Sequence, residues 1–341
     1  MADSPAPAAA PVLVLIDDDG GPRLADPAAP HLPVTDQGAT RGDGLFETAL
    51  AVVGRDGVPV VRKLGAHLAR LASSAQALDL PVPGAERWEA AVRLGLEAWA
   101  DGARTADAGT AGARPVPGSR ASVRLTATRG PEVPAGQPVR PTCWVLVTAV
   151  PAPDPARRRA GVSVLLLERG LDSRVVERAP WLLTGAKTLS YAVNMAALRH
   201  ARAQGADDAV FTSADGYLLE GPTSTVLIAR RTPQGRRALV TPLRQKGILA
   251  GTSQSVIFAA AEAEGWELGY GPLVPADLEG IDGMWLVSSV RGVMPVREVD
   301  GRALPVDPAL TDLLQAWLDA DADPGRHTSG DPLPEPPAPG R

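Results

Sequence analysis

The sequence has little that could form disulfides or hold a metal ion. Its 341 residues include one cysteine, Cys143, and four histidines. A single cysteine excludes an intrachain disulfide framework and a metal site built from several thiolates. The histidines lie far apart without the spacing of metal ligands, so we expect no metal centre unless carboxylates assemble one in space.

Long apolar runs and a strong excess of one charge are also absent. No segment approaches the ~20 apolar residues of a membrane span, and residues 1–10 lack the charged start and apolar core of a secretion signal. The net charge is −5 with both signs interspersed, which is not the footprint of nucleic acid binding. We therefore expect a soluble cytoplasmic protein that acts on a small molecule, without nucleic acid or membrane partners.

Length leaves one large or two ordinary domains open, and a candidate linker favours two. Hydrophobic residues make up 45% of the chain, which is enough to bury real cores, and this length suits one large or two ordinary domains. The Pro- and Arg-rich segment 151–160 predicts an exposed linker. We expect a small N-terminal α/β domain at 11–150 and a larger domain at 161–320. The Pro- and Ala-rich ends, 1–10 and 321–341, are predicted to be disordered.

Strand and helix patterns mix without a strict βαβ alternation, which predicts an α+β fold. Period-two patterns and short apolar runs predict strands at 12–16, 45–53, 58–62, 121–128, 142–150, 162–167, 209–212, 217–228, 239–241, 266–270, 284–289 and 296–299. Helical spacing predicts helices at 66–78, 86–100, 188–204, 252–264 and 308–318. Segments 36–44 and 101–119 are predicted loops.

Two side chains suit the ends of one aromatic cofactor. Lys187 precedes a predicted helix in a stretch with few charges, and desolvation would make its neutral amine available as a Schiff-base nucleophile. Glu220 lies among apolar residues of a predicted strand, where a carboxylate needs a partner such as a protonated pyridine nitrogen. The alternatives are an exposed lysine before a helix and an edge-strand glutamate at a bulge marked by Gly221 and Pro222.

A third segment, GILAGTSQS at 247–255, is a glycine-bounded loop that runs into a helix. Free backbone N–H groups at such a helix start, with the hydroxyls of Thr252 and Ser253, suit a phosphate. The alternative is an ordinary helix cap. The order lysine, glutamate, phosphate loop favours a binding site for pyridoxal phosphate.

With these segments together, the chain resembles the class IV pyridoxal-phosphate enzymes, which include branched-chain aminotransferases, D-amino acid aminotransferases and 4-amino-4-deoxychorismate lyases. The resemblance implies the two-domain fold type IV, with cofactor binding in the larger domain, and a homodimer. The matching stretches are RGDGLFETAL (41–50), AHLARL (66–71), KTLSYAVNMAALRHARAQG (187–205), DGYLLEGPTSTVLI (215–228), GILAGTSQS (247–255) and WLVSSVRGVMPVREVDG (285–301).

The resemblance also implies roles for the cofactor residues. Lys187 would form the Schiff base and shuttle protons, and Glu220 would hold the pyridinium nitrogen. The residues that would bind the phosphate or lie close to the cofactor are Arg70, Thr252, Ser253 and Ser289. Tyr191 would approach the ring hydroxyl, although its spacing from the lysine differs by one residue from the family pattern. Thr225 stands where many members have asparagine.

Other positions bear on the substrate. Arg124 lies on the polar face of its predicted strand, where a guanidinium can grip a carboxylate. Phe46 and Arg291 stand where family members line the pocket; the alternatives are a structural wall for Phe46 and a solvent-facing side chain for Arg291.

The segment from Lys187 most resembles aminodeoxychorismate lyases, which release pyruvate and 4-aminobenzoate. The alternatives are a class IV aminotransferase acting on branched-chain or D-amino acids, and an inactive binding protein on the same fold.

Overall fold

The computed structural model describes residues 10–17, 21–102, 114–243 and 247–320. It divides into two compact units: unit 1 runs to Ala152 and includes Lys187–Ser190, whereas unit 2 comprises Pro153–Ala186 and the chain from Tyr191 onward. The change of unit falls in the predicted linker, which is not a bare linker because Pro155–Ala160 forms helix α4. The termini predicted to be disordered lie outside the described residues, apart from residue 10, as does most of the predicted 101–119 loop.

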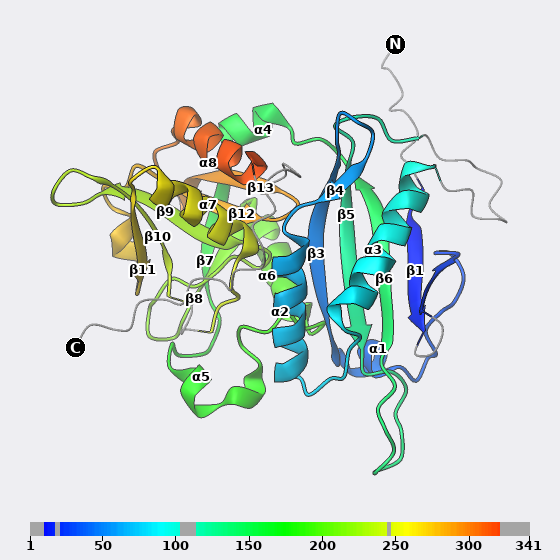
Figure 1. Cartoon of the computed structure of the whole chain (residues 1–341). Coiled ribbons are helices and arrows are strands. Elements are labelled where there is room, and N and C mark those ends of the chain that lie inside the picture. Colours follow the sequence, from blue (N-terminus) through cyan, green and yellow to red (C-terminus); the bar gives the residue numbers. More distant parts are fainter. Residues whose placement is uncertain (1–9, 18–20, 103–113, 244–246, 321–341) are drawn as a thin grey trace. The chain divides into compact units, whose positions relative to one another are not determined.

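Unit 1 is an antiparallel sheet with the strand order β2-β1-β6-β5-β3-β4. Its strands are β1 (Val12–Asp17), β2 (Gly21–Ala25), β3 (Gly44–Val53), β4 (Pro59–Val61), β5 (Arg120–Thr128) and β6 (Thr142–Val150), and its helices are α1 (Gln37–Arg41), α2 (Leu64–Ala77) and α3 (Ala85–Ala100). Figure 1 shows α2 and α3 lying along this sheet. Strand β2 and helix α1 were not predicted, and α1 corrects the expectation of a loop at 36–44.

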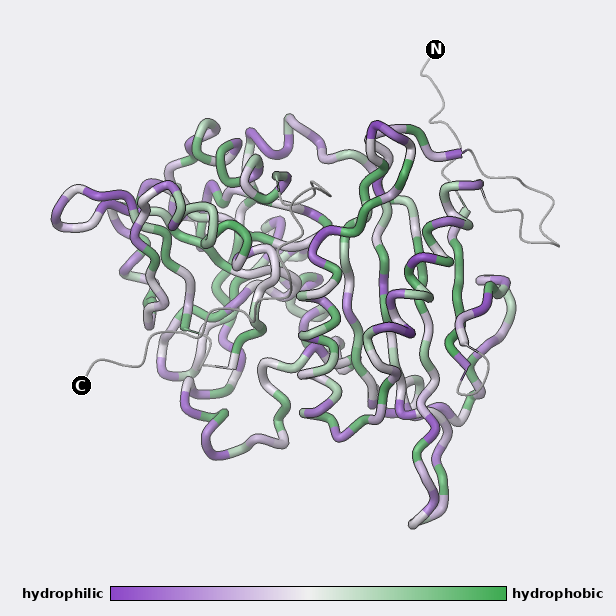
Figure 2. Tube along the Cα trace, viewed as in Figure 1, coloured by the Kyte–Doolittle hydropathy of each residue, from purple (hydrophilic) through white to green (hydrophobic). Residues whose placement is uncertain are grey.

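Alternation along the strands explains how α3 covers one face of the sheet. Val14, Val145 and Val147 face the same side and are fully buried. Gly95 of α3 lies so close to this layer that an added Cβ would be 3.1 Å from Val147 and 3.2 Å from Val14. The alternation of hydrophilic and hydrophobic positions along α3 is visible in Figure 2. A small residue therefore lets the helix approach the sheet closely.

Unit 2 contains a mixed eight-stranded sheet with the order β11-β10-β9-β12-β13-β7-β8, and β14 pairs with β13. The strands are β7 (Val162–Glu168), β8 (Asp208–Thr212), β9 (Thr225–Arg231), β10 (Arg237–Pro242), β11 (Glu267–Gly271), β12 (Gly283–Ser288), β13 (Gly292–Val299) and β14 (Arg302–Ala303). The helices are α4, α5 (Val175–Arg178), α6 (Ala192–Ala203), α7 (Thr252–Ala263) and α8 (Pro308–Ala320), with 3₁₀ turns at Pro180–Leu182 and Pro275–Leu278.

Helices α7 and α8 pack on this sheet through a cluster that includes Leu227, Leu239, Ile257, Trp285 and Leu314. Each of these side chains is almost fully buried. Burying a large apolar side chain contributes roughly 1.5–3 kcal/mol, so this cluster holds α7 and α8 against the strands.

Two predicted elements near the lysine and the glutamate were wrong in their bounds. The strand expected at 217–228 begins only at Thr225, because Gly221 pairs with Ser224 around a tight turn and Pro222 has no N–H to donate. Glu220 therefore lies in a loop. The helix expected at 188–204 begins at Ala192, because the residues just after Lys187 are paired with β3 instead.

Candidate functional site

Lys187 is held by the edge of β3. The backbone N–H of Phe46 donates to the Lys187 carbonyl at 3.0 Å, and the N–H of Leu189 donates to the Gly44 carbonyl at 2.8 Å. Leu45 and Thr188 form an antiparallel bridge between these two bonds. Residues 187–189 thus extend the unit 1 sheet, which fixes the backbone of the lysine.

This pairing requires glycine at position 44. A Cβ there would lie 2.5 Å from the Ala127 carbonyl and 2.7 Å from Cδ1 of Leu189, distances that no side chain tolerates. Gly42 has φ +69, and its carbonyl accepts a hydrogen bond of 3.3 Å from the Ser190 hydroxyl. The Gly-Asp-Gly sequence therefore serves the close approach of residues 187–190.

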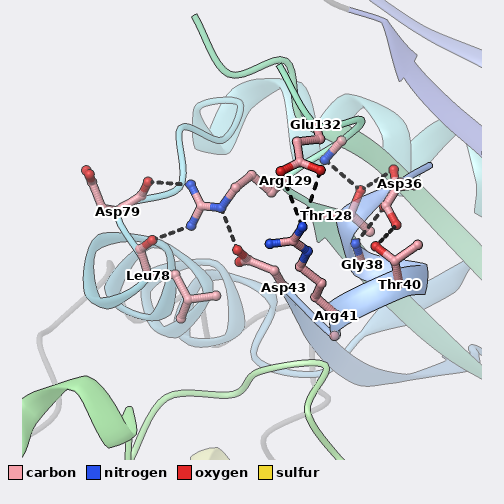
Figure 3. Close-up of polar contacts among 12 residues, drawn as sticks. Asp36, Gly38, Thr40, Arg41, Asp43, Leu78, Asp79, Thr128, Arg129 and Glu132 are labelled. Atoms are coloured by element: carbon pink, nitrogen blue, oxygen red, sulfur yellow. Dashed lines mark hydrogen bonds and ion pairs between the residues drawn. The ribbon is translucent and has the colours of Figure 1, made fainter. Parts of the chain in front are cut away.

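The loop that carries these glycines is anchored by Asp36, which is fully buried (Figure 3). Its Oδ1 accepts the N–H of Gly38 at 2.8 Å, which caps α1. Its Oδ2 accepts the hydroxyls of Thr128 at 2.8 Å and Thr142 at 3.1 Å. A buried carboxylate needs hydrogen-bond donors, and here the donors come from two strands, so Asp36 ties the loop to β5 and β6.

Arg129 ties the same loop to the end of α2 (Figure 3). Its guanidinium donates to Oδ2 of Asp43 at 2.7 Å and to the carbonyls of Leu78 at 2.7 Å and Asp79 at 3.1 Å. Positive charge is favourable at the C-terminal end of a helix. The start of β3 and the helix beside it are thus connected through one side chain.

Helix α2 presents polar side chains from its buried face. The Arg70 guanidinium binds both oxygens of Glu47, with Nε 2.6 Å from Oε1 and Nη2 2.8 Å from Oε2. His67 Nδ1 lies 2.8 Å from Oε2 of the same carboxylate. The Ser74 hydroxyl accepts the backbone N–H of Lys187 at 3.1 Å. The sequence analysis named Arg70, as a phosphate ligand, but did not predict its partner Glu47, nor His67 or Ser74.

The charges of this cluster are set by burial and by the partners of each group. Burial alone would raise the pKa of Glu47, but the charge and hydrogen bonds of Arg70 and the hydrogen bond of His67 lower this pKa from 4.5 to about 2. Burial lowers the pKa of His67; Glu47 raises it, and the charges of Arg70 and Lys187 lower it again. At neutral pH, a neutral His67 therefore donates its Nδ1 proton to an ionised Glu47.

Phe46 brings Lys187 and Arg124 to one ring. The Lys187 Nζ lies 4.5 Å from the Phe46 ring centroid, and the Arg124 guanidinium carbon lies 3.9 Å from it. Both distances suit cation–π contacts. The predicted substrate residues of unit 1 are thus beside the predicted reactive lysine.

In unit 2, Glu220 is only partly exposed and its carboxylate is oriented by two contacts. Oε2 accepts the backbone N–H of Leu249 at 3.0 Å, and Oε1 lies 3.4 Å from Nη1 of Arg169. The contact with Arg169 is at the long end for a hydrogen bond. The bond to Leu249 ties Glu220 to the predicted phosphate segment 247–255.

Two side chains bind the turn after Glu220: Tyr191, the residue just before α6, and Asn194 of α6. The Tyr191 hydroxyl donates to the Pro222 carbonyl at 2.8 Å, and Asn194 Nδ2 donates to the same oxygen at 2.7 Å. The hydroxyl predicted to approach a cofactor ring thus binds the backbone next to Glu220. The contribution of Asn194 was not predicted.

At the start of α7, the hydroxyls of Thr252 and Ser253 are buried, and Thr252 shares a hydrogen bond of 3.2 Å with Ser289. The preceding Gly251 caps the helix without a side chain. A Cβ at Gly251 would lie 2.4 Å from the Thr225 hydroxyl, so only glycine fits. The three predicted phosphate residues of unit 2 are therefore together.

Arg291 is bound to a buried carboxylate. Its Nη1 lies 2.6 Å from Oδ2 of Asp208, whose side chain is 3% exposed, whereas the Arg291 side chain is 31% exposed. A buried aspartate needs such a partner. Sequence reasoning placed Arg291 at a substrate pocket or in solvent and did not predict Asp208.

Within the described ranges, no group of three or more His, Cys, Asp and Glu side chains could hold a metal ion. In the same part of the chain, the helices are too short or too polar to cross a bilayer.

Comparisons with known proteins place these residues in a family context. The amino-transferase class IV family matches residues 44–299. A curated relative, the bifunctional aminodeoxychorismate lyase / D-amino acid transaminase of Mycobacterium tuberculosis, is 44% identical over 84% of this chain and 91% of its own length. A putative branched-chain-amino-acid aminotransferase of Methanocaldococcus jannaschii is 27% identical over 83% of this chain and 87% of its own.

Solved structures agree with the sequence comparison. The PLP-bound form of a hypothetical aminotransferase from Mycobacterium tuberculosis is 41% identical, with a TM-score of 0.77, and the match covers 92% of this chain and 100% of that one. The fold IV-transaminase CpuTA1 from Curtobacterium pusillum is also 41% identical, with a TM-score of 0.77, over 91% of this chain and 99% of its own.

Proposed function

Because the chain belongs to the class IV aminotransferases, enzymes whose cofactor is pyridoxal 5'-phosphate, we propose that it is a lyase that converts 4-amino-4-deoxychorismate to 4-aminobenzoate and pyruvate, a step that supplies a folate precursor. The observation that carries the choice of reaction is the 44% identity to a relative named as such a lyase. The fixed Lys187 at the edge of β3 supports amine chemistry in general.

The residues of this chain fit the cofactor. Lys187 supplies the primary amine, and Glu220 offers an oriented carboxylate to the pyridine nitrogen. The phosphate would bind at the start of α7, where Thr252 and Ser253 place hydroxyls and where the first backbone N–H groups of the helix are available. Ser289 and Arg70 complete the residues we assign to the phosphate, and Tyr191 supports the turn that follows Glu220.

When bound, the cofactor supplies an electron sink for the ring carbon that carries the substrate amine. Lys187 removes the proton from that carbon as a general base. The bond between the ring carbon and the enolpyruvyl oxygen breaks as the ring becomes aromatic. Lys187 returns the proton to the departing group, which leaves as pyruvate. The atoms of the substrate are divided between the two products, so neither water nor a keto acid is consumed. Glu220 would hold the pyridine nitrogen of the cofactor through its carboxylate, which is oriented by the N–H of Leu249.

We assign the substrate carboxylate to Arg124. Its guanidinium lies over Phe46, next to Lys187, and an arginine binds a carboxylate through two parallel hydrogen bonds. The substitution Arg124→Gln should raise KM for aminodeoxychorismate by roughly tenfold or more, because a hydrogen bond to a charged group contributes about 1.5–3 kcal/mol. An unchanged KM would remove Arg124 from the substrate site.

The reaction is tested with purified protein loaded with pyridoxal phosphate and incubated with aminodeoxychorismate without any keto acid. Equal amounts of pyruvate, measured through lactate dehydrogenase, and fluorescent 4-aminobenzoate are expected. The variant Lys187→Ala should give neither product. Absence of both products with the wild-type holoenzyme would overturn the lyase assignment.

A second reaction, transamination of D-amino acids, is favoured by the same relative, whose name includes it. It would use the same Lys187 to move a proton on the amino acid. D-Alanine with 2-oxoglutarate should then yield pyruvate and glutamate, whereas L-alanine serves as the stereochemical control. Both activities in one preparation would make the chain bifunctional.

We also propose that the enzyme is a homodimer, as the family resemblance implies. Light scattering on the purified protein should give a mass of twice the 35.3 kDa of the chain. A mass of one chain at micromolar concentration would contradict this proposal.

A further inference from the structure

We infer that Ser74 is a positioning residue for Lys187. Helix α2 then fixes the position of this lysine relative to Arg70, the arginine that we assign to the phosphate. The inference rests on the proposed function, since it assumes that Lys187 and Arg70 bind the cofactor. It goes further by giving a role to a serine in the middle of an otherwise ordinary amphipathic helix.

The first argument is the geometry at the lysine backbone. The Lys187 carbonyl is bound by β3 through Phe46, and the Lys187 N–H is bound by the Ser74 hydroxyl at 3.1 Å. Two different elements thus hold the two sides of the residue. Ser74 is 3% exposed and the bond is partly buried, so loss of this acceptor should cost up to about 1–3 kcal/mol, the value for a buried N–H without a partner.

The second argument is the register of α2. His67, Arg70 and Ser74 are spaced three and four residues apart, so they lie on one face of the helix. Two of them bind Glu47 and the third binds Lys187. The buried ion pair fixes the helix against β3, and the same helix then carries the hydroxyl that Lys187 uses.

The third argument is electrostatic proximity. The backbone bond to Ser74 places Lys187 beside α2, and the charge of Lys187 contributes, after burial and Arg70, to the lowering of the pKa of the buried His67. A lysine that shifted relative to this helix would change its distance to both Arg70 and His67. Hence the tie through Ser74 should set the environment of the Nζ as well as the position of the backbone.

The test compares Ser74→Ala with Ser73→Ala, which makes the same chemical change one residue away on the exposed face of α2. Hydrogen exchange by mass spectrometry on protein without cofactor follows the amide of Lys187 directly. We expect this amide to exchange at least about tenfold faster in Ser74→Ala, since losing about 1.4 kcal/mol of protection corresponds to a factor of ten. Ser73→Ala should match wild type, and Ser74→Thr, which keeps a hydroxyl, should restore slow exchange.

Two measurements on protein loaded with pyridoxal phosphate test whether loss of the Ser74 hydroxyl also changes the environment of the Lys187 amine. The midpoint of the pH titration of the visible absorbance band should shift in Ser74→Ala but not in Ser73→Ala. Cofactor should also dissociate faster on dialysis from Ser74→Ala. A variant that matches Ser73→Ala in amide exchange, absorbance midpoint and dialysis would overturn the inference.

The outcomes separate this inference from the proposed function. If wild-type protein never shows an absorbance band that Lys187→Ala abolishes, the assignment of Lys187 fails and the role of Ser74 toward the cofactor fails with it. If the wild-type band is present and Ser74→Ala behaves as Ser73→Ala, only the role of Ser74 is refuted.

Discussion

Replacing Glu47 with glutamine removes the anion from the buried cluster on α2. The side chain is fully buried and binds Arg70, whose own side chain is 10% exposed. A drop of the Glu47 pKa from 4.5 to about 2 corresponds to about 3 kcal/mol of folding stability at neutral pH, at about 1.4 kcal/mol per pH unit. Breaking a buried pair on one side costs roughly 3–5 kcal/mol. Glu47→Gln should therefore lower the free energy of unfolding by about 3 kcal/mol or more.

The contribution of Glu47 to the free energy of unfolding depends on pH in a direction that its pKa shift sets. The folded-state pKa lies below the unfolded value, so the stabilisation is fully present above pH 4.5 and is lost as the pH falls toward about 2. The difference between wild type and Glu47→Gln should thus be largest at neutral pH and shrink through this window. Urea unfolding, followed by tryptophan fluorescence at several pH values, measures the difference.

The control for Glu47→Gln is Glu132→Gln. Glu132 pairs with Arg41 at 3.2 Å, but the two side chains are 66% and 60% exposed. An exposed pair contributes about 0–1 kcal/mol. The reasoning is refuted if Glu47→Gln costs no more than Glu132→Gln, or if its cost is the same at pH 7 and below pH 3.

Two further substitutions probe unit 2, and a third, in α2 of unit 1, serves as a control. Gly251→Ala would bring a Cβ to 2.4 Å from the Thr225 hydroxyl. It should weaken binding of pyridoxal phosphate by roughly tenfold or more, measured by titrating the apo protein. In the control Gly65→Ala a Cβ meets nothing within 4 Å, so this variant should stabilise α2 by about 0.5–1 kcal/mol and leave cofactor binding unchanged. Asp208→Asn removes the charged partner of Arg291 and should lower the free energy of unfolding by about 1–3 kcal/mol. This is less than the loss expected for a fully buried pair, because the Arg291 side chain is 31% exposed. A loss below about 0.5 kcal/mol in urea unfolding would contradict the ion pair.

The family and the α+β fold of type IV were predicted from the sequence and are confirmed by the comparisons. The periodic helices were also predicted well: the helix expected at 66–78 is α2 at Leu64–Ala77, and that expected at 86–100 is α3 at Ala85–Ala100. Local apolar spacing determines which face of such a helix is buried. Short-range patterns are therefore informative wherever one face packs on a sheet.

The buried Glu47 was missed although its sequence holds a signal. Glu47 lies two residues from both Leu45 and Ala49 on β3, so its carboxylate is on the same face of the strand as these two fully buried side chains. A charge on such a face needs a partner, and His67 and Arg70 share a face of the next helix. Reading the strand and the helix together would have predicted the cluster.

The pairing of Lys187 with β3 could not be predicted from local pattern. Thr188, Leu189 and Ser190 suit a helix start as well as a strand edge, and the hydrogen bonds that decide the matter come from residues 44–46, far away in the sequence. The same holds for Glu220, whose loop depends on the turn at Pro222 and on the bracing by Tyr191. Long-range backbone pairing overrides local propensity at both positions.

The membership of Lys187–Ser190 in unit 1 has a consequence for the order of assembly. All six strands of unit 1 precede Lys187 in the chain, so during synthesis the edge of β3 at residues 44–46 is made before the residues that pair with it. An unpaired strand edge is a template for wrong partners, and it closes only when residues 187–189 arrive. A chain that ends between Ala152 and Lys187 would therefore lack the residues that pair with positions 44–46 of β3, and this part of its edge would stay open.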